Sequence, residues 1–231
     1  MRLDKFLCDS GYGTRSQVKQ LIKAGQVFVN GALCRQAEFK IDEKSDIVSV
    51  DGKECSYQKF VYYMLHKPAD CVCAVKDNVS RTVMEYLAEE DLRKDLFPVG
   101  RLDKDTEGLL LITNDGALSH KLLSPKKHVP KTYYLKIKKE LSDADIKALE
   151  TGVDIGDEKK TLPATVTRLT KKELQLTISE GRFHQVKRML LALGNEVIYL
   201  KRISMGSLYL DENLKPGEYR ALTGEEIKNL C

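Results

Sequence analysis

The apolar run Leu109-Leu110-Leu111-Ile112-Thr113 constrains the fold of this 231-residue chain more than any other segment. Its aliphatic side chains cannot all face water, so the run predicts a buried strand. The polar turn Asn114-Asp115-Gly116 closes the strand, and a glycine-flanked loop over residues 100–108 leads into it. Such a loop can bring a reactive carboxylate to a ligand while the strand behind it stays rigid. The loop offers three candidate acids: Asp103, Asp105 and Glu107.

The first sixty residues predict a compact α+β module. Leu3, Phe6 and Leu7 share one helical face, and Thr14 is a good N-cap for a second helix over 15–24. Asn30-Gly31 is a strong hairpin signal, and Asp51-Gly52 marks another turn. Short strands are expected at 26–29, 39–41 and 47–50, before a polar link over 54–59.

From Phe60 onward, strand-like and helical segments alternate. We expect strands at 61–65, 109–113, 133–137, 165–169, 174–178 and 197–200, with further strands toward Arg220. We expect helices at 83–92, 117–123, 142–150 and 184–193, the third opened by a capping box of Ser142 and Asp145. This order predicts an α+β domain with a mixed, mainly antiparallel sheet flanked by helices. The expected domains are therefore 1–58 and 60–231.

Composition excludes several classes of protein. Hydrophobic residues make up 42% and charged residues 31%, as in a globular protein with a core, and no apolar stretch is long enough for a membrane span. The start has no apolar signal-peptide core, so we expect a cytoplasmic protein. Six scattered cysteines show no disulfide framework, and Cys71-Val72-Cys73 has neither a second pair nor a histidine at zinc spacing. Reduced thiols and no metal site are expected.

Charge is distributed unevenly although the net charge is only +4. Residues 119–139 carry seven lysines and two histidines without an acid. Arg182, His184, Lys187 and Arg188 gather at the start of one predicted helix, where the helix dipole favours acids instead. A phosphate-rich ligand explains such a cluster, and a basic face paired with surface acids is the alternative. Lys131-Thr132-Tyr133-Tyr134 adds aromatic rings suited to base stacking, although alternation also places one tyrosine in the core.

These motifs together resemble a known family. The loop and strand read G-R-L-D-x-x-T-x-G-L-L-L-x-T-N-D-G, with K-T-Y at 131–133 and G-R-x-H-Q-V-K-R-M at 181–189. This set resembles the pseudouridine synthases related to the small-subunit ribosomal RNA enzyme A. The opening R-L-D-K-F-L at 2–7 resembles the start of an S4 RNA-binding domain, so the resemblance covers essentially the whole chain.

The resemblance implies a role for individual residues. Asp103 matches the catalytic aspartate, Tyr133 the tyrosine that packs against the target base, and Lys187 the basic residue that pairs with the aspartate. Many relatives have arginine where this chain has Lys187. The lysine ammonium is a point charge, whereas an arginine guanidinium can bind a carboxylate through two hydrogen bonds. Residues expected to contact RNA are Arg101, Arg182, His184, Arg188 and Lys131, with Arg15, Lys19 and Lys23 sharing one face of the second helix.

The implied reaction is an isomerisation of uridine in RNA. It breaks the N-glycosidic bond, rotates the base and rejoins it through carbon, without a cofactor. An ionised aspartate can act as nucleophile or base. The sequence does not decide among three roles: attack on the sugar, attack on the base, and removal of a ribose proton. The target base must first leave its stack.

The resemblance also implies a partner. We expect a monomer that acts on 16S ribosomal RNA in a small-subunit assembly intermediate. The alternatives are a synthase of the same family acting on 23S ribosomal RNA, a non-catalytic rRNA-binding assembly factor, and a glycoside hydrolase that uses Asp103 and Asp105.

Overall fold

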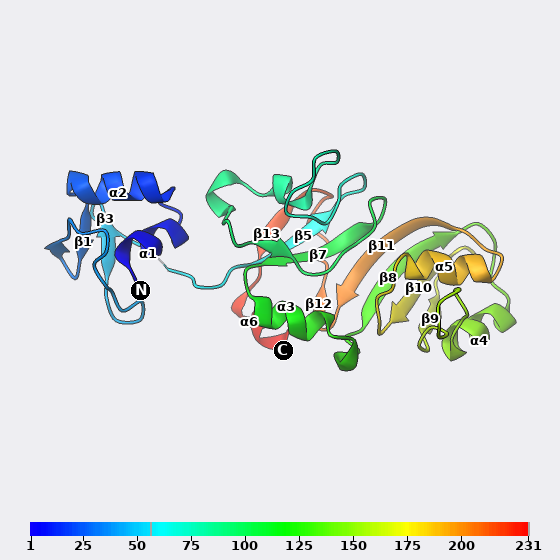
Figure 1. Cartoon of the computed structure of the whole chain (residues 1–231). Coiled ribbons are helices and arrows are strands. Elements are labelled where there is room, and N and C mark those ends of the chain that lie inside the picture. Colours follow the sequence, from blue (N-terminus) through cyan, green and yellow to red (C-terminus); the bar gives the residue numbers. More distant parts are fainter. Residues whose placement is uncertain (56, 231) are drawn as a thin grey trace. The chain divides into compact units, whose positions relative to one another are not determined.

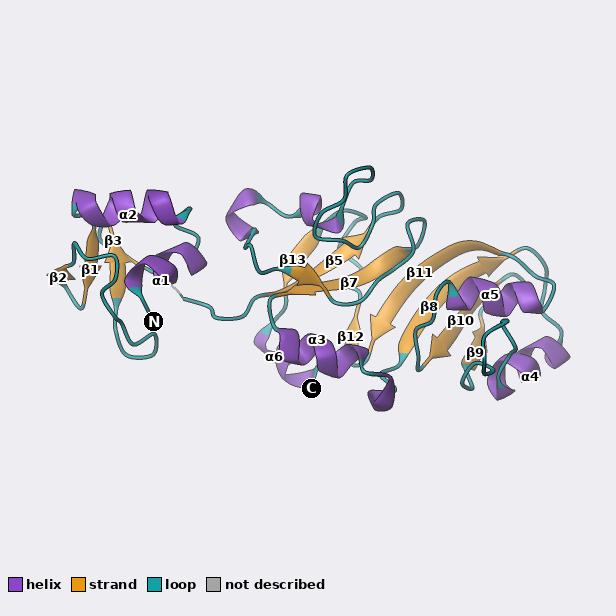
Figure 2. Ribbon diagram, viewed as in Figure 1, coloured by secondary structure: helices purple, strands orange, loops and turns teal. Residues whose placement is uncertain are grey.

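The computed structural model describes residues 1–55 and 57–230, in two compact units (Figures 1 and 2). Residues 1–61 and 88–94 belong to unit 1, and residues 62–87 and 95 onward belong to unit 2. Ser56, within the expected link, and Cys231, one of the six cysteines, lie outside the described residues. The other cysteines are free thiols. No helix in the described ranges is long and apolar enough to cross a bilayer.

Unit 1 packs two helices against a small antiparallel sheet with the strand order β2-β1-β3-β4. Leu3, Phe6 and Leu7 of the first helix are at most 2% exposed, as their spacing predicts. The elements are α1 (Leu3–Asp9), α2 (Arg15–Ala24), β1 (Val27–Val29), β2 (Ala32–Leu33), β3 (Val48–Val50), β4 (Lys53–Glu54) and the 3₁₀ turn η2 (Glu89–Asp91).

Local signals set the ends of these elements. The Thr14 hydroxyl accepts from the Gln17 backbone N–H, and the Gln17 side chain accepts from the Thr14 N–H, which closes a capping box. Asn30 and Gly31 both have positive φ, the geometry of the hairpin turn that their sequence predicts.

The expected strand at 39–41 is wrong. Its contact with other extended backbone is a single bridge between Arg2 and Lys40. The Phe39 carbonyl accepts from the Leu3 N–H, and the Ala37 carbonyl accepts from the Asp4 N–H. This segment therefore satisfies the free N–H groups at the start of α1 instead of joining the sheet.

Unit 2 is built on one mixed sheet, and its main path, among residues 62–230, runs β13-β5-β7-β11-β8-β10-β9. All its strand pairs are antiparallel except β7 with β11, which confirms the predicted sheet. The strands are β5 (Tyr62–Lys67), β6 (Phe97–Pro98), β7 (Glu107–Thr113), β8 (Lys131–Ile137), β9 (Thr165–Arg168), β10 (Glu173–Ile178), β11 (Val197–Met205), β12 (Leu208–Tyr209) and β13 (Tyr219–Ala221).

The parallel seam between β7 and β11 is short. Its register pairs are Glu107 with Lys201 and Gly108 with Arg202. A Cβ at Gly108 would lie 2.2 Å from the Arg202 carbonyl oxygen, and φ of Gly108 is +109°. Glycine is required here because the backbones approach so closely.

Helices cover both halves of this sheet (Figure 2). One core joins β8 and β10 to the helices α4 and α5, and a second joins β5 and β7 to α3 and α6. The bounds are α3 (Gly116–Leu123), α4 (Asp143–Thr151), α5 (Gln185–Ala192), α6 (Gly224–Asn229), and the 3₁₀ turns η1 (Val83–Tyr86) and η3 (Pro125–Lys127). The capping box of Ser142 and Asp145 opens α4 as predicted.

The expected helix over 83–92 is wrong. The segment holds two 3₁₀ turns, and Leu87 and Ala88 between them are extended. The chain passes from unit 2 to unit 1 at this point. The extended backbone also lets Leu87 become buried at 6% exposure, so tertiary packing overrides the helical pattern.

Candidate active site

The loop before β7 opens into a pocket of about 680 Å³ in unit 2. The residues of the predicted site that line this pocket are Arg101, Asp103, Lys131, Tyr133, Arg182 and His184. Of the three acids in the loop, all of them described, Asp103 alone lines it. Glu107 instead accepts a hydrogen bond from the Tyr199 hydroxyl at 2.6 Å.

A buried lysine holds the loop in place. Lys67 is 0% exposed, and its ammonium donates to the carbonyls of Pro68 at 2.9 Å, Lys104 at 3.2 Å and Thr106 at 2.8 Å. Burial lowers the pKa of Lys67. The Leu102 N–H also donates to Cys73 Sγ at 3.3 Å. The backbone on both sides of Asp103 is therefore fixed by hydrogen bonds.

Helix α5 brings a cation to the loop. Lys187 Nζ lies 3.2 Å from Asp103 Oδ2 and 2.5 Å from Asp105 Oδ1. Burial opposes the charged form of Lys187, but the hydrogen bond to Asp105 and the charge of Asp103 raise its pKa. Burial likewise opposes the charged form of Asp105, yet the hydrogen bond from Lys187 lowers its pKa. The pairing expected for Lys187 is present, and the ammonium is shared between two carboxylates.

His184 approaches the other carboxylate oxygen. Its Nε2 lies 3.6 Å from Asp103 Oδ1, and the residue stands in the left-handed region just before α5. The ring stacks on Phe183, with centroids 3.9 Å apart. Phe183 is 69% exposed and lines the pocket. Sequence reasoning treated Phe183 only as part of a motif, although an aromatic residue beside a basic cluster was a usable signal.

Tyr133 lines the pocket from β8 and is 8% exposed. Alternation along β8 turns residues 131, 133, 135 and 137 toward one face, and all four are buried. Tyr134, on the other face, packs edge to face with Tyr199. The alternation that was expected to bury one of the two tyrosines thus places Tyr133 in the lining of the pocket that Asp103 also lines.

Arg182 and Arg188 are bound within the protein. Arg182 donates to Glu180 at 3.0 Å, to Asp157 at 3.3 Å and to the carbonyls of Lys159 and Lys160. Arg188 contacts Asp157 at 2.5 Å and the carbonyl of Ile155. Pairing with acids, the alternative that the sequence left open, describes both guanidinium groups.

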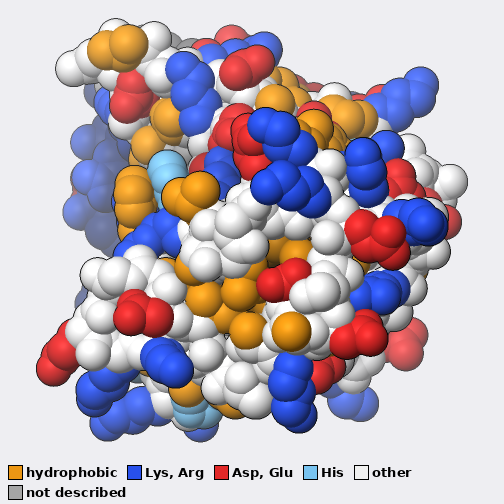
Figure 3. Space-filling view, turned by 90° about the vertical axis from the view of Figure 1, so that its right-hand side faces the viewer, with side chains coloured by type: hydrophobic (Ala, Val, Ile, Leu, Met, Phe, Trp, Pro, Cys, Tyr) orange, Lys and Arg blue, Asp and Glu red, His pale blue; other side chains and the backbone are white. Residues whose placement is uncertain are grey.

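The end of unit 2 that carries α4 and α5 is shown in Figure 3. Hydrophobic side chains gather in a central patch there, and mixed acidic and basic side chains surround it. Basic and acidic side chains are therefore interleaved on this face.

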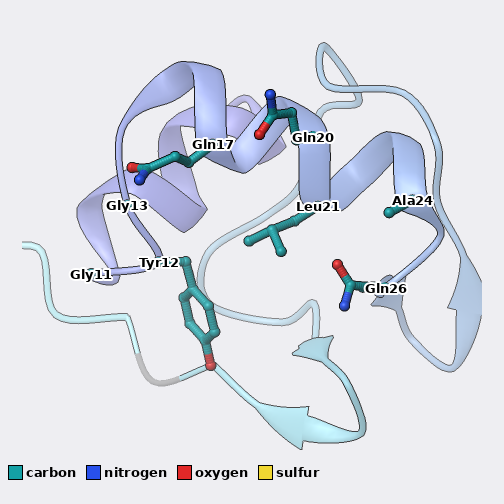
Figure 4. Close-up of a pocket in the computed structure, with 8 residues that line it drawn as sticks. All are labelled: Gly11, Tyr12, Gly13, Gln17, Gln20, Leu21, Ala24 and Gln26. Atoms are coloured by element: carbon teal, nitrogen blue, oxygen red, sulfur yellow. The ribbon is translucent and has the colours of Figure 1, made fainter.

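In unit 1, the basic residues of α2 lie apart from its pocket. Arg15, Lys19 and Lys23 are exposed, and none of them lines the pocket. Uncharged residues line it (Figure 4): Gly11, Tyr12, Gly13, Gln17, Gln20, Leu21, Ala24 and Gln26. The three cations thus stand on the exposed surface of α2.

Arg202 is a further pocket residue that sequence reasoning missed. It lines the pocket from β11 and is 2% exposed. The signal was present in the alternation of this strand, which places Arg202 on the same buried face as Leu200. A charged residue in a buried register position is uncommon and points to a specific role.

Comparisons with known proteins agree on one family. The model for RNA pseudouridylate synthase matches residues 61–192, and that for the S4 domain matches residues 1–48. An uncharacterized RNA pseudouridine synthase of Bacillus subtilis, YtzG, is 50% identical over 98% of this chain and 97% of its own length. The ribosomal small subunit pseudouridine synthase A of Escherichia coli is 41% identical over the full length of both chains. A crystal structure of a pseudouridylate synthase covers both chains fully, with 38% identity and a TM-score of 0.71.

Proposed function

The chain belongs to the RNA pseudouridylate synthase family and carries an S4 domain, and from this we propose that it converts one uridine of 16S ribosomal RNA to pseudouridine through Asp103. That it is a pseudouridine synthase acting on RNA follows from the family and the full-length relatives. The choice of 16S ribosomal RNA is supported by similar proteins of Vibrio cholerae and Escherichia coli that are named ribosomal small subunit pseudouridine synthase A.

One observation carries the choice of Asp103. It is the acid of the loop that faces the pocket, and it does so beside Tyr133 with a cation on its carboxylate. A carboxylate paired with Lys187 at 3.2 Å is held in a fixed position when a base displaces water from the pocket. It is then ready to attack the nucleotide or to remove a proton from it.

The reaction needs no atom from outside the RNA except exchangeable protons. The N1–C1′ bond of uridine breaks, the base turns, and a C5–C1′ bond forms. C5 loses a proton and N1 gains one, so the product is an isomer. Tyr133, buried on one side of the pocket, is the surface on which the turning base packs.

The rim of the pocket would grip the RNA around the target. The exposed stack of Phe183 on His184 offers a platform for an unpaired base, and Arg101 is exposed at the same rim. Arg182 and Arg188 contribute by holding residues 155–160, because their guanidinium groups already donate to that segment. In the S4 domain, Arg15, Lys19 and Lys23 would bind the RNA backbone.

The test uses purified protein and a 16S transcript labelled with [5-³H]uridine. Loss of the C5 proton releases tritium, and carbodiimide-stop mapping locates the product. We expect release with the native chain and none with Asp103→Asn, whose RNA affinity should be unchanged. A chain that binds RNA but releases nothing would be an assembly factor, and free uracil would indicate a hydrolase.

A second measurement tests the target. Mapping of pseudouridines in rRNA from cells with and without the gene should show one missing position in 16S ribosomal RNA. A missing position in 23S ribosomal RNA instead would keep the reaction and refute the proposed target.

A further inference from the structure

Two buried cations share the pocket with Asp103. Lys131 is 9% exposed and Arg202 2%, and both line the pocket. Lys131 Nζ donates to the Val129 carbonyl at 3.0 Å, and Arg202 Nε donates to the Leu109 carbonyl at 2.9 Å. Neither forms an ion pair with an acid within residues 1–55 and 57–230.

The Arg202 guanidinium keeps unused hydrogen-bonding capacity. Its second terminal nitrogen is buried and has no hydrogen-bond partner among the described residues. Burial lowers the pKa of Lys131, and the positive charge of Arg202 lowers it further. The charge of Arg202 thus makes the charged form of Lys131 less favourable.

The sheet places both cations next to Tyr133. Lys131 stands two residues before Tyr133 on β8, so both side chains leave the same face. Arg202 is the register partner of Tyr133 on the neighbouring strand β11. A base that packs against Tyr133 therefore has one cation along the strand and another across it.

Burying unpaired cations is unfavourable, and proteins seldom do so without a partner. A ligand that brings negative charge to this place would offset the cost. The phosphates of an RNA strand are hydrated and bulky. Cationic and aromatic groups that could contact them are exposed at the rim of the pocket. Lys131 and Arg202 lie deeper, at the level of Tyr133, where a base rather than a phosphate arrives.

We propose that Lys131 and Arg202 bind the carbonyl oxygens of the flipped uracil and stabilise the negative charge that the ring acquires during the reaction. This inference rests on the proposed function. When the N1–C1′ bond breaks, its electron pair passes to the ring and spreads over N1 and the two carbonyl oxygens. When the C5–C1′ bond forms, the ring returns that charge, C5 loses its proton and N1 takes one up. Donors aimed at the developing charge lower the barrier of both steps.

The experiment compares Lys131→Met and Arg202→Met with the native chain. The single-turnover rate of tritium release from the [5-³H]uridine-labelled 16S transcript is measured at saturating enzyme, and RNA affinity by filter binding. We expect each variant to lose roughly 10²-fold in rate, as on removal of a donor to a developing charge. RNA affinity should change less than about twofold, because the charge develops only during reaction.

Matched variants control for packing. Lys136→Met removes a cation from the exposed face of the same strand, where it pairs with Glu173, and should leave the rate unchanged. Lys131→Arg and Arg202→Lys keep the charge and should recover most of the rate. Lys131→Met loses one hydrogen bond, the one to the Val129 carbonyl, so this variant should fold. It therefore tests the proposal even if Arg202→Met fails to fold.

The outcomes are distinct. Native rates in Lys131→Met and in a folded Arg202→Met would overturn the inference while the proposed function stands. If the variants lost RNA affinity but kept the native rate, Lys131 and Arg202 would be assigned to a phosphate. This result would also overturn the inference. If the native chain released no tritium, the proposed function itself would fail.

Discussion

Removal of the ammonium of Lys187 should cost most of the activity and little of the RNA binding. The change Lys187→Met keeps the length of the side chain and removes the charge. It leaves the carboxylates of Asp103 and Asp105 without the cation that now lies between them. Among the described residues, the basic group that would remain within 4 Å of Asp103 is His184, at 3.6 Å, which is charged only when it is protonated.

The magnitude follows from the geometry. At the 3.2 Å between Lys187 Nζ and Asp103 Oδ2, the attraction is about 5 kcal/mol at an effective dielectric constant of about 20 and about half that at 40. The two side chains are 26% and 25% exposed, so a value near the lower end, about 3 kcal/mol, is appropriate. If Lys187 holds Asp103 in its reacting position in the transition state, the loss of this attraction there lowers the rate about 10²-fold, because about 1.4 kcal/mol corresponds to a tenfold change.

The assay is single-turnover tritium release, with RNA affinity measured separately. Lys187→Arg restores a cation and should stay within about tenfold of the native rate. Asp105→Asn is the matched control, since this acid is 69% exposed and does not line the pocket. Native activity in Lys187→Met, or a loss in Asp105→Asn as large as in Asp103→Asn, would refute the assignment of the two acids.

Three further changes test the fold and the RNA contacts. Gly108→Ala should destabilise unit 2 by more than about 2 kcal/mol in denaturant unfolding, because its Cβ meets backbone at 2.2 Å; Gly116→Ala, with nothing within 4 Å, should be nearly neutral. Burial lowers the pKa of His66 below its ordinary 6.5, so the unfolded chain takes up that proton first. The free energy of unfolding should therefore be highest above pH 6.5 and decline as the pH falls from there through the folded pKa, and His66→Phe should flatten that part of the curve. The third change replaces three cations of α2 in the S4 domain with glutamine: Arg15, Lys19 and Lys23. It should weaken rRNA binding and reduce the salt slope by about 1 for each phosphate that the protein no longer binds; an unchanged slope would show that this face does not bind RNA.

The sequence predicted best what depends on neighbours in the chain. The N-cap at Thr14, the capping box at Ser142 and the turn at Asn30-Gly31 each use contacts within three residues, and each is present. The segments 39–41 and 83–92 failed because distant partners decide them. Their own propensity was outweighed by tertiary contacts.

The candidate site shows the same division. Asp103, Tyr133 and Lys187 are far apart in the chain. In the sequence, they are linked only through the resemblance to a family. Arg182 and Arg188 were predicted to contact RNA, and the sequence did not indicate that their guanidinium groups also donate to residues 155–160. Alternation along β11 marks Arg202 as buried, but its place beside Tyr133 depends on the pairing of β11 with β8, which the sequence does not show.

The short seam between β7 and β11 also sets when the pocket can be completed during synthesis of the chain. The loop with Asp103 and the strand β7 are translated early, but the strand that completes the pocket ends at Met205. A nascent chain that lacks β11 has Asp103 but neither Arg202 nor the backbone against which Gly108 rests. The pocket is thus complete only after β11 has been translated, while residues 1–48, the part matching the S4 domain, are translated first.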